Sequence, residues 1–523
     1  MMNSPSLPGD TTAAVSATPS PEPVGRLGGV WAGVAGVTSA AAGLAAGHLV
    51  AAWINPAASP LVAVGAVVVD LTPTPLKEWA AASFGTADKA VLLAGIAVVV
   101  AALAFWAGLL AVRRPRGGLA VTVVLGALAV AAAMSRPGAD RLDWLPGLVT
   151  TLVGAAALTG QRRWLSAPPG TDGRLDRRRF LLGAAGLLAG SAGLGALGQR
   201  LGGPPVSETP IPLPEPVSPI PDLPAGVEGT VPGITPLRTP TPDFYRIDIA
   251  LTVPRIDARS WRLSVEGMVA QPFTLTFDEL LALPMIERDI TLTCVSNPIG
   301  GPYCGSTRWR GVRVADLLRR AGPTPEADMV LSSSPDGFSA STPLPVLLDG
   351  RDAMIAVAMD GEPLTAVHGG PARLLTPGLY GYVGATKWLE KLLVTTFAAH
   401  EAYWTQRGWS ELGPVKTACR IDTPRGSARA GQVAIGGVAW ATHRGVGAVQ
   451  VRIDSGPWQA ATLGPDVGLD YWRQWYLLWD ASPGVHAVTA RAADASGEFQ
   501  TEKVTGEFPD GATGYAVASI TIS

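Results

Sequence analysis

Cysteine is scarce in this chain of 523 residues, and the shortage excludes several kinds of site. Only Cys294, Cys304 and Cys419 are present, too few for a disulfide framework and not in the paired pattern of a cysteine zinc site. The sequence also has no Cys-x-x-Cys-His run, and therefore no motif for covalently attached haem. A site that uses the thiol of a single cysteine remains possible.

An excess of charge of either sign is also missing. The 40 Lys and Arg residues nearly balance the 42 Asp and Glu residues, so there is no global electrostatic case for a nucleic-acid partner. Hydrophobic residues make up 47% of the chain, which is high for a soluble protein, and the excess lies in the first two hundred residues. A membrane-associated N-terminal region followed by soluble domains is therefore expected.

The N-terminal region divides into a polar tail and a series of apolar segments. Residues 1–25 are rich in Pro, Ser and Thr and are predicted to be disordered. A membrane span needs about 20 apolar residues, and five segments within residues 26–200 meet this length, the third and fourth marginally. They are Gly28–Trp53, Asp88–Val112, Gly118–Met134, Trp144–Gly160 and Phe180–Gly198. The pattern predicts a five-helix transmembrane anchor in contact with membrane lipid. The shorter run Leu61–Leu71 is expected at the outer interface.

The distribution of Lys and Arg over the short loops predicts the orientation of this anchor. An N-terminus in the cytoplasm places ten of these residues inside and five outside. Five crossings then put everything after Gly198 outside, which predicts a multi-pass protein of the cell membrane with an extracytoplasmic body. His48 is the only histidine in the five spans, and a bis-histidine haem needs two. With few ionisable residues, the spans indicate an anchor rather than a transporter.

The fifth span is preceded by the run Arg177–Arg178–Arg179, followed by Phe180 and Leu181. Ordinary positive charge at the cytoplasmic end of a span explains such a run. The run also resembles a twin-arginine export signal, which is read by a receptor rather than acting through charge alone. Both interpretations stand at this point.

Three further regions follow the anchor. Residues 201–242 contain 13 prolines and predict an extended, semi-rigid linker that lifts the next domain off the membrane. From 243 to 410 short strands and helices alternate, which predicts an α+β domain. Within it, Trp261–Gly267 alternates as a strand, and Val314–Ala321 is an amphipathic helix closed by Gly322.

Residues 411–523 predict an immunoglobulin-like antiparallel β-sandwich. Four segments alternate apolar and polar residues at period two, with Gly and Pro turns between them. The segments are Gln432–Trp440, Ala448–Ile453, Tyr471–Trp479 and Val485–Ala493. The region also holds five tryptophans that can fill its core or a subunit interface, namely Trp440, Trp458, Trp472, Trp475 and Trp479.

The stretch from Asp289 to Gly301 lies at the centre of the α+β domain. Ile290, Leu292 and Cys294 alternate as a half-buried strand, and the Ser-Asn-Pro-Ile-Gly-Gly run after it forces a tight turn. A cysteine held at a strand end by a rigid turn can offer its thiolate to a soft metal. The alternative is that Cys294 is a small buried hydrophobe, as most free cysteines are.

A second motif, His368–Gly369–Gly370–Pro371–Ala372–Arg373, is followed by Lys387–Trp388. Together with the Cys294 loop, it closely resembles the sulfite oxidase family of molybdenum enzymes, over roughly residues 241–520. The resemblance implies that Cys294 ligates molybdenum and that His368, Arg373 and Lys387 hold a pterin and its phosphate. A phosphate suits a guanidinium fork, a Lys charge and backbone amides opened by glycine. The implied cofactor is therefore Mo-molybdopterin.

The resemblance extends to neighbouring segments and to partners. Phe244–Asp248 resembles the family's entry segment, in which Asp248 stands where sulfite oxidases usually have histidine, so Arg246 is expected to assist in holding the cofactor. The family's C-terminal domain mediates dimerisation, which implies a homodimer. No haem domain is fused to the chain, so electrons are expected to pass to or from a separate carrier. Cys304 is interpreted as structural, with a second thiol near the site as the alternative.

Two departures from the family concern the substrate. Sulfite oxidases follow the cysteine with Gly-Asn-Arg, whereas this chain has Pro298 and Ile299 in that region, and Phe338 stands where the family has tyrosine. The chain is therefore expected to transfer an oxygen atom to or from a small substrate, with sulfite oxidation proper or sulfoxide reduction as alternatives. From a different class, a membrane-tethered binding protein without cofactor remains the rival hypothesis.

Overall fold

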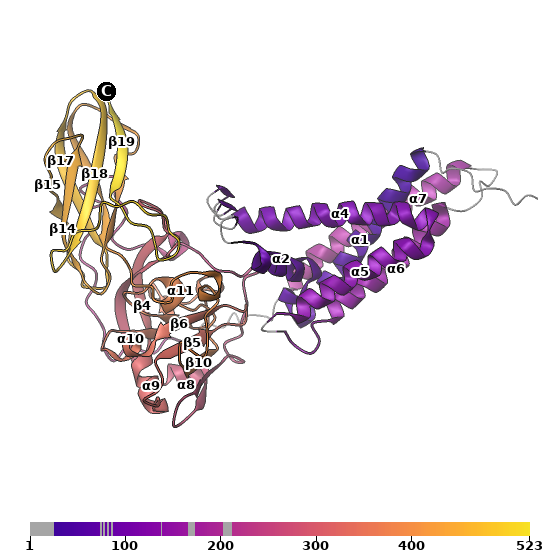
Figure 1. The fold of residues 1–523 in the computed structure, drawn as a ribbon, viewed down its shortest axis with the longest axis horizontal. Coiled ribbons are helices and arrows are strands. Elements are labelled where there is room, and N and C mark those ends of the chain that lie inside the picture. The colour runs from indigo at the N-terminus through magenta and orange to yellow at the C-terminus, as the bar shows by residue number, and fades with distance from the viewer. Residues whose placement is uncertain are drawn as a thin grey trace, which may run out of the picture.

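The computed structural model describes residues 26–73, 87–136, 139–165, 173–201 and 212–523, together with residues 76, 79, 80, 83 and 84. The described part is elongated, with a helical bundle at one end, a mixed α/β domain in the middle and paired β-sheets at the C-terminal end (Figure 1). The predicted disordered tail, residues 1–25, lies outside the described residues.

The bundle contains the predicted apolar segments as helices. They are α1 (Arg26–Ile54), α2 (Pro60–Leu71), α4 (Asp88–Arg113), α5 (Pro115–Met134), α6 (Leu145–Leu165) and α7 (Gly173–Leu201). Three stretches of the described residues are long and apolar enough to cross a membrane, namely Gly29–Ile54, Lys89–Arg113 and Pro115–Met134. Helices α1 and α4 approach closely at Gly36, where an added Cβ atom would lie 1.9 Å from the carbonyl oxygen of Ala104.

The middle domain is built on two five-stranded sheets. The first has the order β2 (Phe273–Thr276), β1 (Arg262–Gly267), β10 (Lys391–Thr395), β5 (Met329–Ser333) and β6 (Ser339–Pro343), with β1 and β10 parallel. The second has the order β3 (Met285–Thr293), β4 (Cys304–Arg313), β7 (Met354–Met359) and β8 (Glu362–Pro363), and β9 (Arg373–Leu375) also pairs with β7. Its helices are α8 (Phe277–Leu281), α9 (Val314–Ala321), α10 (Leu344–Leu348) and α11 (Gly381–Gly384).

The core of this domain lies where α8 and α9 cover the first sheet. The predicted helix α9 buries Leu317 and Leu318 against Trp261 and Leu263, and Gly322 ends it in the left-handed conformation at φ +65°. Each fully buried leucine contributes roughly 1.5–3 kcal/mol. Burial of one helix face and a glycine at the helix end are the signals that the sequence carried.

The C-terminal region forms two sheets around one apolar core. One has the order β11 (Ala418–Thr423), β13 (Gly431–Trp440), β17 (Arg473–Ala481) and β16 (Thr462–Leu463). The other has β12 (Ser427–Ala428), β19 (Ala516–Ile522), β18 (Gly484–Asp494), β14 (Val446–Ile453) and β15 (Gln459–Ala460). Of the five tryptophans, Trp475 belongs to this core and Trp479 packs against it, whereas Trp440 and Trp472 pack with Val295 against the middle domain. The β11 and β19 strands were not among the predicted segments.

The proline-rich stretch differs from the expected free spacer. Residues 202–211 lie outside the described residues, but 212–242 run along the middle domain. The amide of Val217 donates to the carbonyl of Met285 at 2.8 Å, and that of Thr239 donates to Ser306 at 2.7 Å. Leu237 is 3% exposed. Proline favours an extended chain, but it does not prevent that chain from packing along a sheet edge, so the described half of the stretch belongs to the domain.

Candidate cofactor and catalytic site

The β3–β4 pair fixes the position of Cys294. Thr293 ends β3 directly opposite Cys304, where β4 begins, so the intervening residues form a closed loop. The Cys294 amide donates to the carbonyl of Tyr303 at 3.0 Å, and the Asn297 side-chain oxygen accepts from the Tyr303 amide at 2.8 Å. The thiol at the strand end is therefore held in place and is half-buried. The strand that leads to it is buried on both faces from Ile290 to Thr293, and not half-buried as predicted.

Cys294 opens onto a cavity of about 130 Å³ inside the middle domain. Arg373 and Lys387 line the same cavity, so three of the five predicted site residues meet there. Phe338, Trp404 and Trp409 also contribute to the lining. His368 lies behind Arg373 and accepts from its Nη1 atom through the His368 carbonyl at 3.0 Å. Arg246 stays at the exposed edge and reaches the cavity only through Asp248.

Arg373 is a buried cation whose hydrogen-bonding capacity is only partly used. It lies in β9 with 5% of its surface exposed, and its Cζ atom is 5.2 Å from the centre of the Trp309 ring. Its Nε atom has no partner among the described residues. Burial lowers the pKa of Arg373 to about 10, which still leaves it charged at neutral pH. A buried guanidinium of this kind lacks an anion.

The glycines of the His368–Arg373 motif bring Lys387 to the cavity. Gly369 has φ +98°, and a Cβ atom there would lie 2.9 Å from Cα and Cβ of Lys387. The following residue, Trp388, is itself in the left-handed region at φ +50°, which is strained for a side chain of its size. Its indole donates to the carbonyl of Ala366 at 2.8 Å. Burial first, and then Arg373, lower the pKa of Lys387 to about 8 despite its contact with Asp248.

His368 is neutral and presents an unused acceptor. Burial, reinforced by Arg373 and Lys387, lowers the pKa of His368 to about 4. Its Nε2 atom lies 3.0 Å from the carbonyl oxygen of Thr241, and because that oxygen only accepts, Nε2 carries the proton. Nδ1 is then an acceptor with no partner in the described part of the chain.

Three residues of the site were not predicted from the sequence. Asp248 is buried, and although burial alone would raise its pKa, contacts with Lys387, Lys89 and Arg246 hold the pKa well below the usual range. Asp336 and Trp409 each leave a buried polar atom unpartnered among the described residues, Oδ2 and Nε1 respectively. They come from separate segments, and no local pattern in the sequence links them.

The two thiols of the β3–β4 pair differ in surroundings. Burial raises the pKa of Cys294, although the nearby Ser296 amide partly opposes this. Cys304 packs in a separate apolar cluster, with its sulfur 3.3 Å from Oγ1 of Thr293, and it does not line the cavity of Cys294. This is the environment expected of a structural cysteine.

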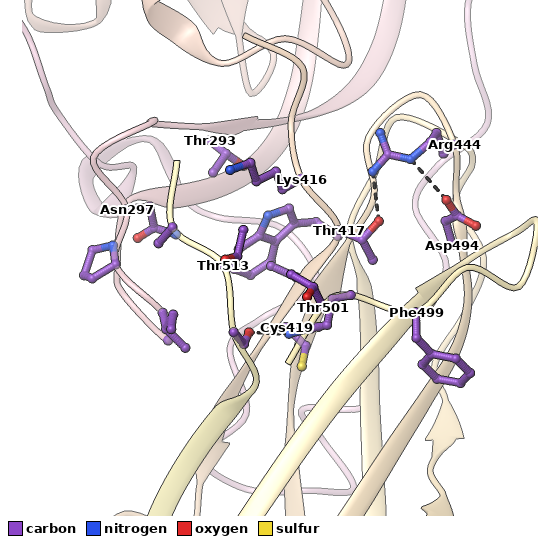
Figure 2. Close-up of a pocket in the computed structure, with 18 of the residues that line it drawn as sticks. Thr293, Asn297, Lys416, Thr417, Cys419, Arg444, Asp494, Phe499, Thr501 and Thr513 are labelled. Carbon is purple, nitrogen blue, oxygen red and sulfur yellow. Dashed lines mark hydrogen bonds and ion pairs between the residues drawn. The ribbon is translucent and has the colours of Figure 1, made fainter. Parts of the chain in front are cut away.

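A larger cavity of about 370 Å³ lies on the other side of the same loop, against the C-terminal sheets (Figure 2). Pro298 and Ile299 line this cavity, whereas Phe338 lines the smaller one, so the two departures from the family lie in different cavities. Its cations are paired: Lys416 lies 3.0 Å from Asp510, and Arg444 lies 3.2 Å from Asp494.

The neighbouring arginines of β4 do not supply a cation to either cavity. Arg308 pairs with Asp289 at 2.9 Å, and Arg310 pairs with Glu287 at 2.7 Å. Both also donate to carbonyl groups of the proline-rich stretch, at Pro221 and Pro214 respectively. They therefore tie that stretch to β4.

Comparison with known proteins agrees with this geometry. Residues 250–404 match the family model described as an oxidoreductase molybdopterin binding domain. The uncharacterized oxidoreductase YuiH of Bacillus subtilis (strain 168) is 33% identical over 157 residues, covering 30% of this chain and 76% of that protein. The mitochondrial sulfite oxidase of Drosophila melanogaster is 29% identical over 305 residues, covering 49% of this chain and 52% of that protein. Nitrate reductase [NADH] 1 of Oryza sativa subsp. japonica is 27% identical over 48% of this chain and 35% of that enzyme.

Fold and site together define an oxidoreductase with a molybdopterin-binding domain. The chain belongs to the sulfite oxidase family of these enzymes. It spans about half the length of the sulfite oxidases that it matches and about a third of the nitrate reductase. A solved structure of the sulfane dehydrogenase SoxCD from Paracoccus pantotrophus covers 48% of this chain and 71% of that chain at 23% identity, with a TM-score of 0.43. That likeness is too weak to support an inference.

Proposed function

We propose that the chain is a membrane-anchored molybdenum-cofactor oxidoreductase that transfers an oxygen atom to or from a small substrate on the outer side of the membrane. The observation that carries the proposal is the set of unpaired buried groups around Cys294. Arg373 Nε and His368 Nδ1 have no partner among the described residues, and Arg373 and Lys387 share the cavity that Cys294 lines. Such groups persist in a folded protein when a ligand completes them.

The residues fit an anionic pterin with a thiolate-bound metal. Arg373 and Lys387 offer charged donors to a phosphate, and neutral His368 offers an acceptor to a pterin N–H group. Cys294 would supply the sulfur ligand, because a coordinating metal deprotonates a thiol even where burial has raised its pKa. When bound, the cofactor supplies the redox change and the oxygen-atom transfer. The chain orients the cofactor and excludes water with Phe338, Trp404 and Trp409.

The anchor and the partners belong to the same proposal. We take α1, α4, α5, α6 and α7 as a five-helix anchor, with the N-terminus in the cytoplasm as the Lys and Arg distribution indicates. Electrons would pass to or from a separate carrier. The two C-terminal sheets would act as an immunoglobulin-like dimerisation domain, so a homodimer is expected.

Metal and pterin content of the purified full chain tests the proposal. We expect near-stoichiometric molybdenum by mass spectrometry, and a fluorescent pterin released on denaturation. The rival, a membrane-tethered binding protein, predicts neither. A folded chain from cells replete in molybdenum that contains no metal and no pterin would refute the enzyme assignment.

The run at Arg177–Arg179 gives a test of export. It lies at the start of α7, and its side chains are outside the described part of the structure. Replacing Arg178 and Arg179 with lysine keeps the charge and removes only a receptor-read signal. If the run is a twin-arginine signal, the folded body should be trapped inside, and protease added outside should not reach it. Normal protease access in the lysine variant would mean that the run acts only as positive charge at the cytoplasmic end of the span.

A further inference from the structure

Three side chains from the end of the helical bundle nearest the middle domain make polar contacts with that domain. Lys89, in the first turn of α4, donates from Nζ to Oδ1 of Asp248 at 2.7 Å and to the carbonyl of Ala250 at 2.7 Å. Arg136, just after α5, donates to the carbonyl of Asp336 at 3.0 Å. Asp70, near the end of α2, accepts from the hydroxyl of Tyr403 at 2.8 Å and pairs with Arg407. We call Asp70, Lys89 and Arg136 the outer seat.

The outer seat agrees with the predicted topology. With the N-terminus in the cytoplasm, the connections from α1 to α4 and from α5 to α6 both lie outside. Asp70 lies in α2 within the first connection, Lys89 lies in the first turn of α4 where that connection ends, and Arg136 lies at the start of the second. The bundle and the middle domain meet at this end in Figure 1. The contacts made from these two regions therefore lie on the side where the Lys and Arg distribution alone places the domain.

The partners of the outer seat border the cavity of Cys294. Asp248 and Asp336 line that cavity. Tyr403 lies with its ring 6.3 Å from that of Phe338, which also lines it. The contacts are therefore gathered around the candidate cofactor site rather than spread over the domain surface.

Asp248 joins the outer seat to the cofactor-holding residues. One oxygen, Oδ1, accepts from Lys89, and the other, Oδ2, accepts from Arg246 at 2.9 Å and from Lys387 at 3.0 Å. The side chain of Asp248 is only 4% exposed, so its charge is compensated by these neighbours rather than by water. Removing Lys89 leaves the carboxylate with two of these three cations, and one of them is Lys387.

We propose that Lys89 is a positioning residue for the cofactor, acting through Asp248 when the catalytic domain docks on the outer seat. This rests on the proposed function of the cavity. With Lys89 in place, the negative charge of Asp248 is partly neutralised by a cation of the anchor. Lys387 is then held less tightly by Asp248, and its positive charge can attract an anionic ligand. Without Lys89, Asp248 holds Lys387 more tightly, the positive charge near the cavity falls, and residues 246–250 lose their tie to α4. The anchor then contributes to the site as well as to localisation.

The test uses the full chain in detergent and follows two quantities. The first is the rate at which bound molybdopterin is lost, measured from the pterin that stays with the protein. The second is hydrogen exchange of the amides in 246–251. We expect Lys89→Gln to speed cofactor loss about three- to ten-fold, the size of one ordinary hydrogen bond, because Lys89 acts on the cofactor indirectly, and to raise exchange in this segment. Lys89→Arg should restore both.

A matched control is Lys391→Gln, which breaks an ion pair with Glu266 within the same domain, away from the bundle. It should change neither quantity. In an Asp248→Asn background, Lys89→Gln should add nothing to the rate of cofactor loss, because the carboxylate charge through which Lys89 acts is gone. Unchanged cofactor loss in Lys89→Gln overturns the proposal, even if exchange rises. If the unmodified chain carries no pterin, the proposed function is wrong. The docking contact of Lys89 is then tested by hydrogen exchange alone, and wild-type exchange rates in Lys89→Gln would reject it.

Discussion

Two cavities flank the loop after β3, and they differ in size and in the pairing of their charges. The larger one, about 370 Å³, pairs Lys416 with Asp510 and Arg444 with Asp494 (Figure 2). The smaller one, about 130 Å³, holds Cys294 and the incompletely partnered Arg373. A desolvated charge that lacks a partner costs several kcal/mol, so it marks a place where a ligand supplies the partner. Incomplete pairing is therefore a better guide to the cofactor than volume.

The largest expected effect separates the cavities by their thiols. Cys294→Ser should reduce turnover to background while the domain still folds, because a hydroxyl is a poor donor to a soft metal. Cys419→Ser makes the same change at a residue that lines the larger cavity, and it should keep turnover with a modest loss of stability. Activity assays and thermal unfolding check both variants. Wild-type turnover in Cys294→Ser with molybdenum still bound would contradict the ligand assignment.

The next comparison uses the arginine of each cavity. Arg373→Gln removes a charged donor to the cofactor, and each such contact is worth about 1.5–3 kcal/mol, so for two contacts the affinity for the pterin should fall by more than about a hundredfold and pterin content should fall with it. Arg444→Gln breaks only contacts within the protein, with Asp494, Thr417 and the carbonyl of Val415, and it should leave pterin content unchanged. Pterin fluorescence per mole of protein is the measurement. Equal losses in the two variants would mean that charge pairing does not distinguish the cavities.

A smaller effect tests how the smaller cavity is shaped. Gly369→Ala and Gly361→Ala both place a side chain at positive φ, +98° and +83°. Only at Gly369 does the new Cβ atom meet a neighbour, Lys387, whereas at Gly361 nothing lies within 4 Å. Both variants should lose about 1–3 kcal/mol of stability from backbone strain. Only Gly369→Ala should also lose cofactor, by about tenfold if Lys387 shifts out of contact. The same pterin loss in both would show that strain alone is responsible.

Three residues that line the smaller cavity could be picked out from the sequence because they lie in two compact motifs. Cys294 stands at the end of an alternating strand, and Arg373 and Lys387 follow a glycine pair whose conformation leaves little choice of side chain. The predicted α9 and the alternating strands of the C-terminal region follow from periodicity in the same way. In these segments the sequence pattern predicts the secondary structure that is observed.

The parts that the sequence could not predict depend on packing between distant segments. Ile299 faces the larger cavity because the C-terminal sheets close over the loop, which no local pattern encodes. Asp248 binds Lys89 from a helix 159 residues away. The proline-rich stretch packs along the domain because Arg308 and Arg310 donate to its carbonyl groups. The composition of this stretch indicates an extended chain, but it does not indicate which surface that chain packs against.

Sulfite kinetics can test whether the larger cavity receives the substrate. Sulfite is a small dianion that needs charged donors, and here Ile299 stands in the region where sulfite oxidases carry arginine, while Lys416 is paired with Asp510. The wild-type chain should therefore oxidise sulfite poorly and prefer a neutral or organic substrate such as a sulfoxide. Ile299→Arg should lower the Michaelis constant for sulfite about tenfold, the effect of one charge-assisted contact.

Val517→Arg adds the same side chain on β19, at a residue that is 67% exposed and does not line the larger cavity, and it should not change sulfite kinetics. Steady-state assays with an artificial electron carrier measure both variants against wild type. A micromolar Michaelis constant for sulfite in the wild type would reject the substrate preference. A gain in Val517→Arg equal to that in Ile299→Arg would show that net charge, rather than the larger cavity, controls access.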